Sequence, residues 1–255
     1  MLCSCALLIT IQNPAKGIWV NDTTVIQTGS AISEKPIILN APSIGLNINA
    51  ASFVKTYLKK SNLTLVAAKK RGGTVFPIMD SVFTMYDLPA QLKYLAVVES
   101  NLKISVRSQL GAAGMWQLMP SAAKTFGLKA GKDYDERFHV YKSTVAAARY
   151  LKQLYDEFGD WLLAIAAYNA GSGRLHRAIR QAGSHDFWRL QNFLPGETRN
   201  HVKKYISVHY YFEKQGSITT MTKAETQQYT KTLAEFTTDN SAASVTVKEA
   251  VNKPL

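Results

Sequence analysis

Residues 89–100, PAQLKYLAVVES, predict a helix that carries one carboxylate on its apolar face. The opening proline suits a first helical position, because its missing N–H costs nothing there and its ring already fixes φ. Counted in steps of three and four, one stripe of this helix comprises Leu92, Leu95, Ala96 and Glu99. Burial disfavours the charged form of a carboxylate, which is what a general acid near neutral pH requires. The alternative is that Glu99 lies at a frayed helix end and reaches solvent.

Apolar residues keep a helical spacing on both sides of this stretch, so we predict an all-α (mainly α) fold of many helices. Residues 161–170, WLLAIAAYNA, are apolar on nearly every side and are the expected centre of the bundle, with Asp160 as N-cap and Gly171 after the end. The other predicted helices are 51–71 ended by Gly72 and Gly73, 76–86, a short helix before Gly127, 143–158 capped by Ser143 or Thr144, 174–182, and a long helix after Pro195.

The length and charge of the chain limit its class. A chain of 255 residues with 46% hydrophobic composition can bury one core of roughly 150 to 200 residues with flanking segments. A net charge of +12 and a pI near 9.6 imply attraction to anionic polymers such as nucleic acid, a membrane surface or a bacterial envelope. No basic run alternates with aromatic residues as single-stranded nucleic acid requires, so we expect no nucleic acid partner.

The two ends of the chain differ from its centre. Residues 1–50 are predicted to comprise a signal-like segment, MLCSCALLITIQ, followed by an irregular leader. The start of the signal-like segment loosely resembles a lipoprotein processing site, in which Cys5 would be the acylated residue. The only other cysteine is Cys3, so no disulfide or cysteine metal site is expected in the body, and no other stretch could span a membrane. Residues 216–255 are predicted to be a polar, threonine-rich tail with one helix over 223–236 and a loose end. The functional fold is expected within 51–215, its first two helices within 51–86, and a chain cut to 49–215 is expected to stay active.

Polar residues in apolar surroundings are candidate binding residues. Gln117 is flanked by Trp116 and Leu118, and a partly buried amide needs partners that a ligand often supplies; the alternative is a simple turn around two glycines. Tyr168 and Asn169 close the apolar helix and must hydrogen-bond something, although Asn169 alone could cap its own helix end.

Four blocks follow one another along the chain: AVVES at 96–100, SQLGAAGMWQLMP at 108–120, AAYNAG at 166–171 and LPGETR at 194–199. Together they closely resemble the catalytic (SLT) domain of lytic transglycosylases, which is related to goose-type lysozyme, and in particular the membrane-bound transglycosylase D type. The resemblance covers about residues 51–213. It implies a lysozyme-like multi-helix domain with a substrate cleft, and an enzyme that cleaves the MurNAc–GlcNAc β-1,4 bond of peptidoglycan and leaves 1,6-anhydro-MurNAc ends.

The resemblance also implies roles for single residues. Glu99 matches the single catalytic glutamate of the family. The positions that match residues around the bound glycan or its peptide branch are Ser108, Gln117, Met119, Tyr168, Asn169 and Glu197. Three features depart from the family: His201 stands where a tyrosine is usual, residues 106–109 read VRSQ in the sugar-wall loop, and residues 216–255 contain no LysM repeat.

The implied partner is the glycan strand of peptidoglycan, and the implied location is the bacterial envelope, in the periplasm, with an N-terminal signal or lipid anchor as the route to the outer membrane. Glycosidases commonly use two carboxylates, but no second motif-borne carboxylate is evident, so Glu99 is expected to act as acid and then as base. Two alternatives stay open: a lysozyme-like hydrolase, and a non-catalytic glycan-binding relative. The five histidines show no ligand spacing and are expected at the surface or in the core, so we expect no metal and no cofactor; the oligomeric state is left open.

Overall fold

The computed structural model describes residues 24–25, 38–39 and 42–251, with side chains described from 42 to 238. The chain divides into two units, residues 1–39 and 40–255, and each is described by itself. In the first unit, β1 (Thr24–Val25) pairs antiparallel with β2 (Ile38–Leu39), within the predicted irregular leader. The predicted signal-like segment and Cys5 lie outside the described residues.

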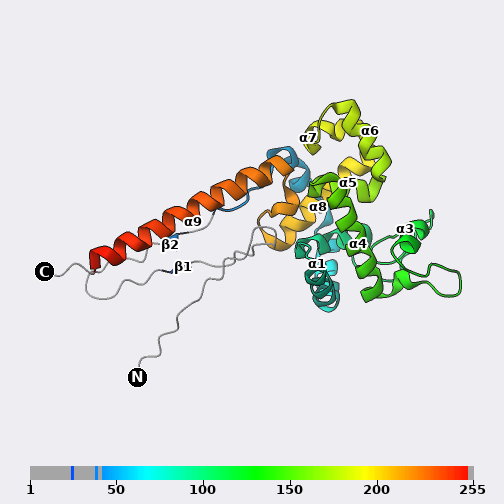
Figure 1. The fold of residues 1–255 in the computed structure, drawn as a ribbon. Helices are drawn as coiled ribbons and strands as arrows, with labels where there is room; N and C mark the ends of the chain where they lie inside the picture. The colour runs from blue at the N-terminus through cyan, green and yellow to red at the C-terminus, as the bar shows by residue number, and fades with distance from the viewer. Residues whose placement is uncertain (1–23, 26–37, 40–41, 252–255) are drawn as a thin grey trace, which may run out of the picture. The chain divides into compact units, whose positions relative to one another are not determined.

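The second unit is mainly α-helical, as predicted (Figure 1). Its α-helices are α1 (Ile48–Met85), α2 (Tyr94–Ser100), α3 (Pro120–Thr125), α4 (Val140–Phe158), α5 (Trp161–Ala170), α6 (Ser172–Ala182), α7 (Phe187–Leu190), α8 (Gly196–Glu213) and α9 (Lys223–Val251). Short 3₁₀ turns lie at Ala90–Lys93, Glu136–Phe138, Gln191–Phe193 and Ile218–Thr220. The helices predicted over 161–170, over 174–182 and after Pro195 are confirmed as α5, α6 and α8.

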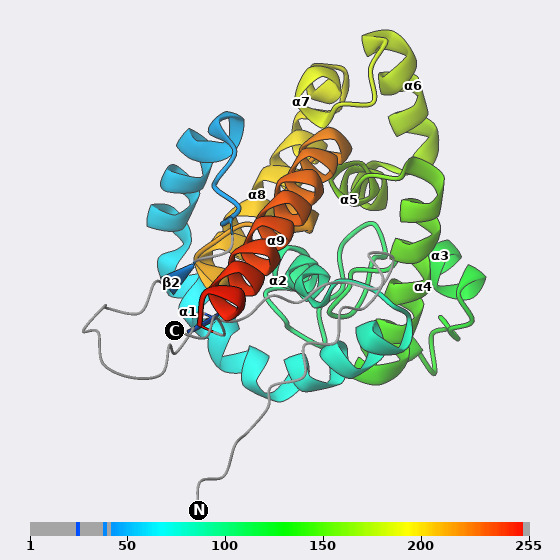
Figure 2. The same cartoon turned by 60° about the vertical axis from the view of Figure 1, so that its left-hand side comes forward.

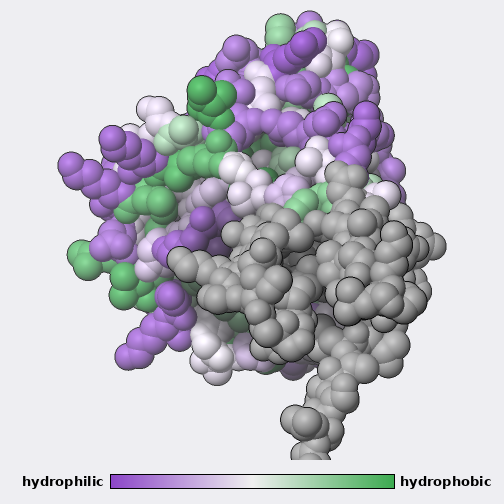
Figure 3. Space-filling view, turned by 90° about the vertical axis from the view of Figure 1, so that its left-hand side faces the viewer, coloured by the Kyte–Doolittle hydropathy of each residue, from purple (hydrophilic) through white to green (hydrophobic). Residues whose placement is uncertain are grey.

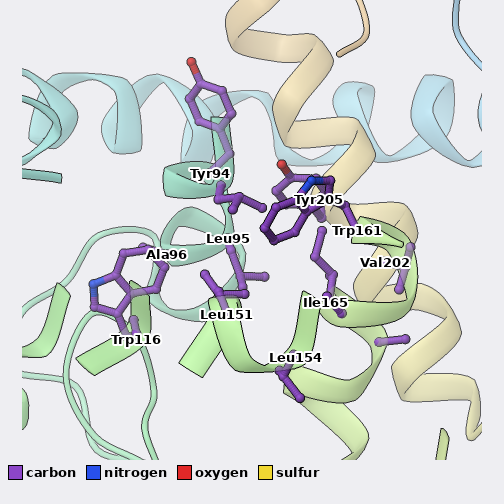
Figure 4. Packing of buried hydrophobic residues seen from close by; sticks show 14 of the residues in the cluster. Tyr94, Leu95, Ala96, Trp116, Leu151, Leu154, Trp161, Ile165, Val202 and Tyr205 are labelled. Carbon is purple, nitrogen blue, oxygen red and sulfur yellow. The ribbon is translucent and has the colours of Figure 1, made fainter. Parts of the chain in front are cut away.

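Helix α5 is the centre of the hydrophobic core, as its all-round apolar sequence predicts. Every residue from 161 to 167 is buried, and α5 packs against both α4 and α8 (Figure 2). Figure 4 shows Ile165 of α5 in one buried cluster with Leu95 of α2, Leu151 of α4 and Tyr205 of α8. Each such aliphatic side chain stabilises the fold by roughly 1.5 to 3 kcal/mol when fully buried. Asp160 caps α5 by accepting a hydrogen bond from the Leu163 amide at 3.1 Å, as predicted.

The prediction of two helices before residue 89 is wrong, because α1 runs unbroken through Gly72, Gly73 and Pro77. Gly72 is buried, and a Cβ at this position would lie 2.5 Å from the Phe76 ring, so the glycine makes room for that ring. The buried face of α1 includes Leu65, Ala68, Met79, Val82 and Phe83. Burial of this face outweighs the cost of about 1 kcal/mol that a glycine adds to a helix interior.

Some apolar side chains of α1 reach solvent, among them Ile48, Leu63, Val66 and Met85. On the face shown in Figure 3, apolar surface is broken up by hydrophilic side chains. Scattered apolar side chains of this kind are ordinary on a protein surface, so they indicate no binding site.

Helix α4 begins before the predicted caps Ser143 and Thr144, and His139 caps it instead. Thr144 lies inside the helix because its hydroxyl is engaged there. It donates to the Val140 carbonyl at 2.7 Å and accepts a hydrogen bond from the Trp116 indole N–H at 3.0 Å. The end of α4 is as predicted, with Gly159 in the left-handed region at φ 63°.

The predicted tail is packed against the core at its start. Thr219 is buried and accepts a hydrogen bond from the Tyr205 hydroxyl at 2.7 Å. The Lys223 amide at the start of α9 donates to the second oxygen of Asp160 at 2.6 Å. Helix α9 also continues past residue 236, where a loose segment is predicted. The predicted boundary at 215 therefore cuts through packed structure, and we propose residues 42 to about 230 as the folded domain.

A chain cut to residues 49–215 is now expected to be less stable than a chain of residues 42–238. The cut removes the partners of Tyr205, Asp160 and His209, and each lost hydrogen bond costs about 1 kcal/mol. We expect the melting temperature to fall by roughly 6 to 12 °C. Thermal unfolding of the two chains side by side measures this, and equal melting temperatures would contradict the proposed boundary.

His209 makes the stability of the domain sensitive to acid. Its ring is fully buried on α8 and Nε2 lies 2.9 Å from the Ser217 hydroxyl. Burial lowers the pKa of His209 to about 3. The unfolded imidazole binds a proton below about pH 6.5 while the folded one does not, so this contribution to stability is complete above pH 6.5 and is lost as the pH falls toward 3.

The measurement compares urea unfolding of the wild type and His209→Gln between pH 7 and pH 4. The difference in unfolding free energy should shrink by at most about 1.4 kcal/mol for each pH unit below 6.5. Asp160, whose pKa burial raises to about 6, acts in the opposite direction but is present in both chains and cancels in the difference. A difference that does not change with pH would contradict a neutral buried His209.

Candidate active site

Glu99 lies in the last turn of α2, and 14% of its side chain is exposed. The rest of its predicted stripe, Leu92, Leu95 and Ala96, is fully buried, so the apolar face of this segment is confirmed. The helix start differs from the prediction, because a 3₁₀ turn follows Pro89 and α2 begins at Tyr94. The low exposure of Glu99 argues against the alternative of a carboxylate reaching solvent.

The segment 106–118 after α2 folds into a small turn whose backbone pairs with itself. Ala113 bridges to both Arg107 and Leu118, and the Ser100 hydroxyl ties the turn to α2 by donating to the Met115 carbonyl at 2.8 Å. Gly114 has φ 78°, and a Cβ on it would lie 1.9 Å from the Arg137 carbonyl oxygen. Only glycine fits this position, because a side chain would meet rigid backbone there.

The Arg137 side chain also holds this turn in place, through hydrogen bonds to its backbone. Its guanidinium is 2% exposed and donates to the carbonyls of Gly111 at 2.7 Å and Leu118 at 2.8 Å. Asp135 binds the same guanidinium through both of its oxygens, and hydrogen bonds from Arg137 hold the pKa of Asp135 below its usual value. Charged residues two apart in a loop carry no periodic signal, so this support could not be predicted.

Ser108 and Gln117 are both used to hold the turn. The Ser108 hydroxyl accepts a hydrogen bond from the Ala112 amide at 3.0 Å. The Gln117 amide group donates to the Gly114 carbonyl at 2.8 Å and the Val106 carbonyl at 3.3 Å. The backbone therefore satisfies the N–H donors of Gln117, as the simple-turn alternative has it. Within residues 42–238, no group donates a hydrogen bond to its carbonyl oxygen.

Tyr168, in the last turn of α5, lies beside Glu99. Its hydroxyl donates to the Trp116 carbonyl at 2.7 Å. Burial, and then the negative charge of the nearby Glu99, raise the pKa of Tyr168 well above its ordinary value. Asn169 does not cap its own helix: its oxygen accepts a hydrogen bond from the Thr198 hydroxyl of α8 at 2.8 Å.

The sequence did not identify His201 as part of the site. It is 7% exposed on α8, and its Nε2 lies 2.9 Å from Oε1 of Glu99, a residue 102 positions earlier in the chain. The only signal was its departure from the tyrosine that the resemblance implies.

The structure thus brings together Glu99, Tyr168 and His201. Asn169 is joined to α8, and the turn that contains Ser108 and Gln117 is tied to the end of α2. Two predicted residues stand apart from these contacts. Met119 is 43% exposed before α3, and Glu197 is exposed in the first turn of α8. Among residues 42–238, no second carboxylate forms a hydrogen bond or an ion pair with Glu99 or His201.

Two surface pockets of the described residues are basic, and neither is lined by Glu99. One of about 460 Å³ is lined by Arg107, Lys132 and Arg137 with small residues, and one of about 290 Å³ by Arg174 and Arg177 with residues 193–195. In the same part of the chain, no group of three His, Cys, Asp or Glu side chains is arranged to hold a metal ion. No helix there is both long and apolar enough to cross a membrane.

Comparison with known proteins finds a family model that matches part of this chain. Residues 84–191, which include the α2 helix, the turn and α5, match the family model described as the transglycosylase SLT domain. These residues belong to the transglycosylase SLT domain family. The SLT domain contains Glu99, Gln117 and Tyr168, whereas His201 and Glu197 follow it on α8.

Two relatives of this SLT domain are named as transglycosylases. The chain is 41% identical over 127 residues to the membrane-bound lytic murein transglycosylase D of Escherichia coli K12, over 48% of this chain and 28% of that relative. It is 35% identical over 127 residues to the peptidoglycan transglycosylase gp16 of Escherichia phage T7, over 48% of this chain and 9% of the relative. The chain thus spans less than a third of either relative.

A solved structure shows the same fold. The 70-kDa soluble lytic transglycosylase in its complex with bulgecin A superposes with a TM-score of 0.51 at 21% identity, over 69% of this chain and 32% of that chain. The predicted mainly α fold of the lytic transglycosylase type is therefore confirmed.

Proposed function

We propose that this chain is a peptidoglycan lytic transglycosylase that cleaves the MurNAc–GlcNAc bond and leaves 1,6-anhydro-MurNAc ends. One observation carries the proposal: a mostly buried glutamate at the end of α2, hydrogen-bonded to His201 and beside Tyr168, in a segment that matches the SLT domain. A positioned carboxylic acid can deliver its proton to a glycosidic oxygen, which is the role proposed for Glu99.

Glu99 serves both halves of the proposed reaction. It first donates its proton to the oxygen of the leaving sugar, and positive charge develops on the MurNAc ring. The C6 hydroxyl of the same ring then attacks, since a tethered group has an effective concentration that free water lacks. Glu99, now ionised, accepts the proton of that hydroxyl.

The glycan-contacting residues are part of the same proposal. We propose that Ser108, Gln117, Met119, Tyr168, Asn169 and Glu197 line the path of the substrate. Support differs among them: the free carbonyl oxygen of Gln117 and the exposed thioether of Met119 can still meet a ligand, whereas the Tyr168 hydroxyl is engaged by the Trp116 carbonyl. Glu197 is exposed and fits a contact with the outer part of the substrate.

The proposed location is the bacterial envelope, in the periplasm, with Cys5 or a signal sequence as the route to the outer membrane. The net charge of +12 favours binding to an anionic wall.

Release of soluble fragments from purified sacculi tests the proposed function. The full chain should release fragments at a rate that rises with its concentration. Protein that co-sediments with sacculi without releasing fragments would instead support the non-catalytic glycan-binding alternative.

A further inference from the structure

His201 has one engaged ring nitrogen and one buried nitrogen without a partner. Nε2 lies 2.9 Å from Oε1 of Glu99. Nδ1 is buried, and within the described residues no hydrogen-bond partner reaches it. The two nitrogens of one ring therefore have opposite environments, and this difference limits where the ring can carry its protons.

Three protonation states of the ring can be compared. The imidazolium ion carries N–H groups on both nitrogens, and the neutral Nδ1–H form carries its only N–H on the buried, partnerless nitrogen. Both states leave a buried donor unpaired, which is costly. The neutral Nε2–H form leaves only an acceptor lone pair unpaired and donates its hydrogen to Oε1 of Glu99. This third state fits the site best.

We propose that His201 is a positioning residue that donates Nε2–H to Oε1 of Glu99 and so leaves Oε2 to carry the catalytic proton. This inference rests on the proposed function of Glu99. Oε2–H gives its proton to the glycosidic oxygen and later accepts the proton of the attacking hydroxyl, while the hydrogen bond to Oε1 persists. His201 neither gains nor loses a proton during the reaction, and the acid does not lose its proton to the imidazole.

Titratable groups on α8 and on the helices packed against it are engaged elsewhere. Tyr168 of α5 donates to the Trp116 carbonyl, and Tyr205, one turn along α8, donates to the Gln91 carbonyl and to Thr219. On α1, Asp80 pairs with Lys93. Among residues 42–238, the ion-pair contact of His201 is with Glu99. The protonation state of the ring therefore depends chiefly on this carboxylate.

The state of the ring can be read without any activity. Protein labelled with ¹⁵N-histidine, with the His201 signals assigned by their loss in His201→Gln, separates the three protonation states by the shifts of the ring nitrogens. We expect the neutral Nε2–H form at pH 7. An imidazolium or Nδ1–H signal at that pH would overturn the proposal.

Kinetics on soluble glycan strands test the positioning role. His201→Phe keeps a ring but no donor, and should lower kcat by about 100-fold with KM changed by less than about threefold. His201→Gln can place an amide N–H near the position of Nε2 but cannot be charged, and should recover at least about tenfold of that loss without shifting the pH profile of kcat. The proposal would be overturned if kcat of His201→Gln were no higher than kcat of His201→Phe. It would also be overturned if the pH profile of kcat lost one of its limbs in His201→Gln. A wild type without activity would reject the proposed function, while the ¹⁵N spectra would still decide the state of His201.

Discussion

Glu99→Gln is expected to slow fragment release from sacculi by about a thousandfold or more, because the amide keeps the shape of the side chain but cannot deliver a proton. The fold should persist, since Glu99 is 14% exposed and an amide can still accept the hydrogen bond from His201 Nε2–H through its carbonyl oxygen. Initial rates of release at matched protein concentration measure the effect, and circular dichroism checks the helix content of the variant.

Glu235→Gln is the matched control. It removes one carboxylate in the same way, but on the exposed part of α9, where its ion pair with Lys231 is 4.0 Å long. Its rate should equal that of the wild type. If a folded Glu99→Gln protein kept even a tenth of the wild-type rate, Glu99 would not be the acid.

Gly114→Ala should destabilise the domain by about 4 kcal/mol and lower its melting temperature by roughly 8 to 16 °C. The added Cβ would lie 1.9 Å from the Arg137 carbonyl oxygen, and φ of 78° is strained for any residue with a side chain. Because that backbone is held by the Arg137–Asp135 pair, relief requires the turn itself to shift, and the turn is tied to α2 through Ser100. We therefore expect fragment release to fall along with thermal stability.

Gly173→Ala makes the same chemical change where nothing lies within 4 Å of the added Cβ, in the first turn of α6. It should remain within about 1 kcal/mol of the wild type, on the stabilising side. Thermal unfolding of both variants gives the comparison, and equal melting temperatures for them would show that the close approach to Arg137 does not limit this turn.

Helices whose pattern comes from burial were the most predictable part of the fold. The all-round apolar helix α5 and the long helix predicted after Pro195 were both confirmed, and Val202, Tyr205 and Ile206 of the latter, α8, are buried. The break predicted at Gly72 was wrong, because a glycine that a neighbouring ring covers within a long helix obeys packing more than local preference. The packed start of the tail was missed for a similar reason: Thr219 is polar, and only its contact with Tyr205 makes it part of the core.

The residues of the candidate site also differ in how well the sequence predicted them. Glu99 was identified from one helix face, which a local pattern can reveal. His201 was not, since its contact with Glu99 spans 102 positions and a histidine has no periodic signature. The Arg137–Asp135 support of the turn depends on where two loops meet, and no spacing in the sequence records this meeting.

The masses of the released sugar ends test the central claim most directly. With Glu99 as the sole acid and base, the C6 hydroxyl captures the reacting ring, and fragments released from sacculi should end in 1,6-anhydro-MurNAc, one water lighter than a hydrolytic end. Mass spectrometry of the wild-type digest separates the two products. A digest dominated by reducing MurNAc ends would contradict the account and make this chain a lysozyme-like hydrolase.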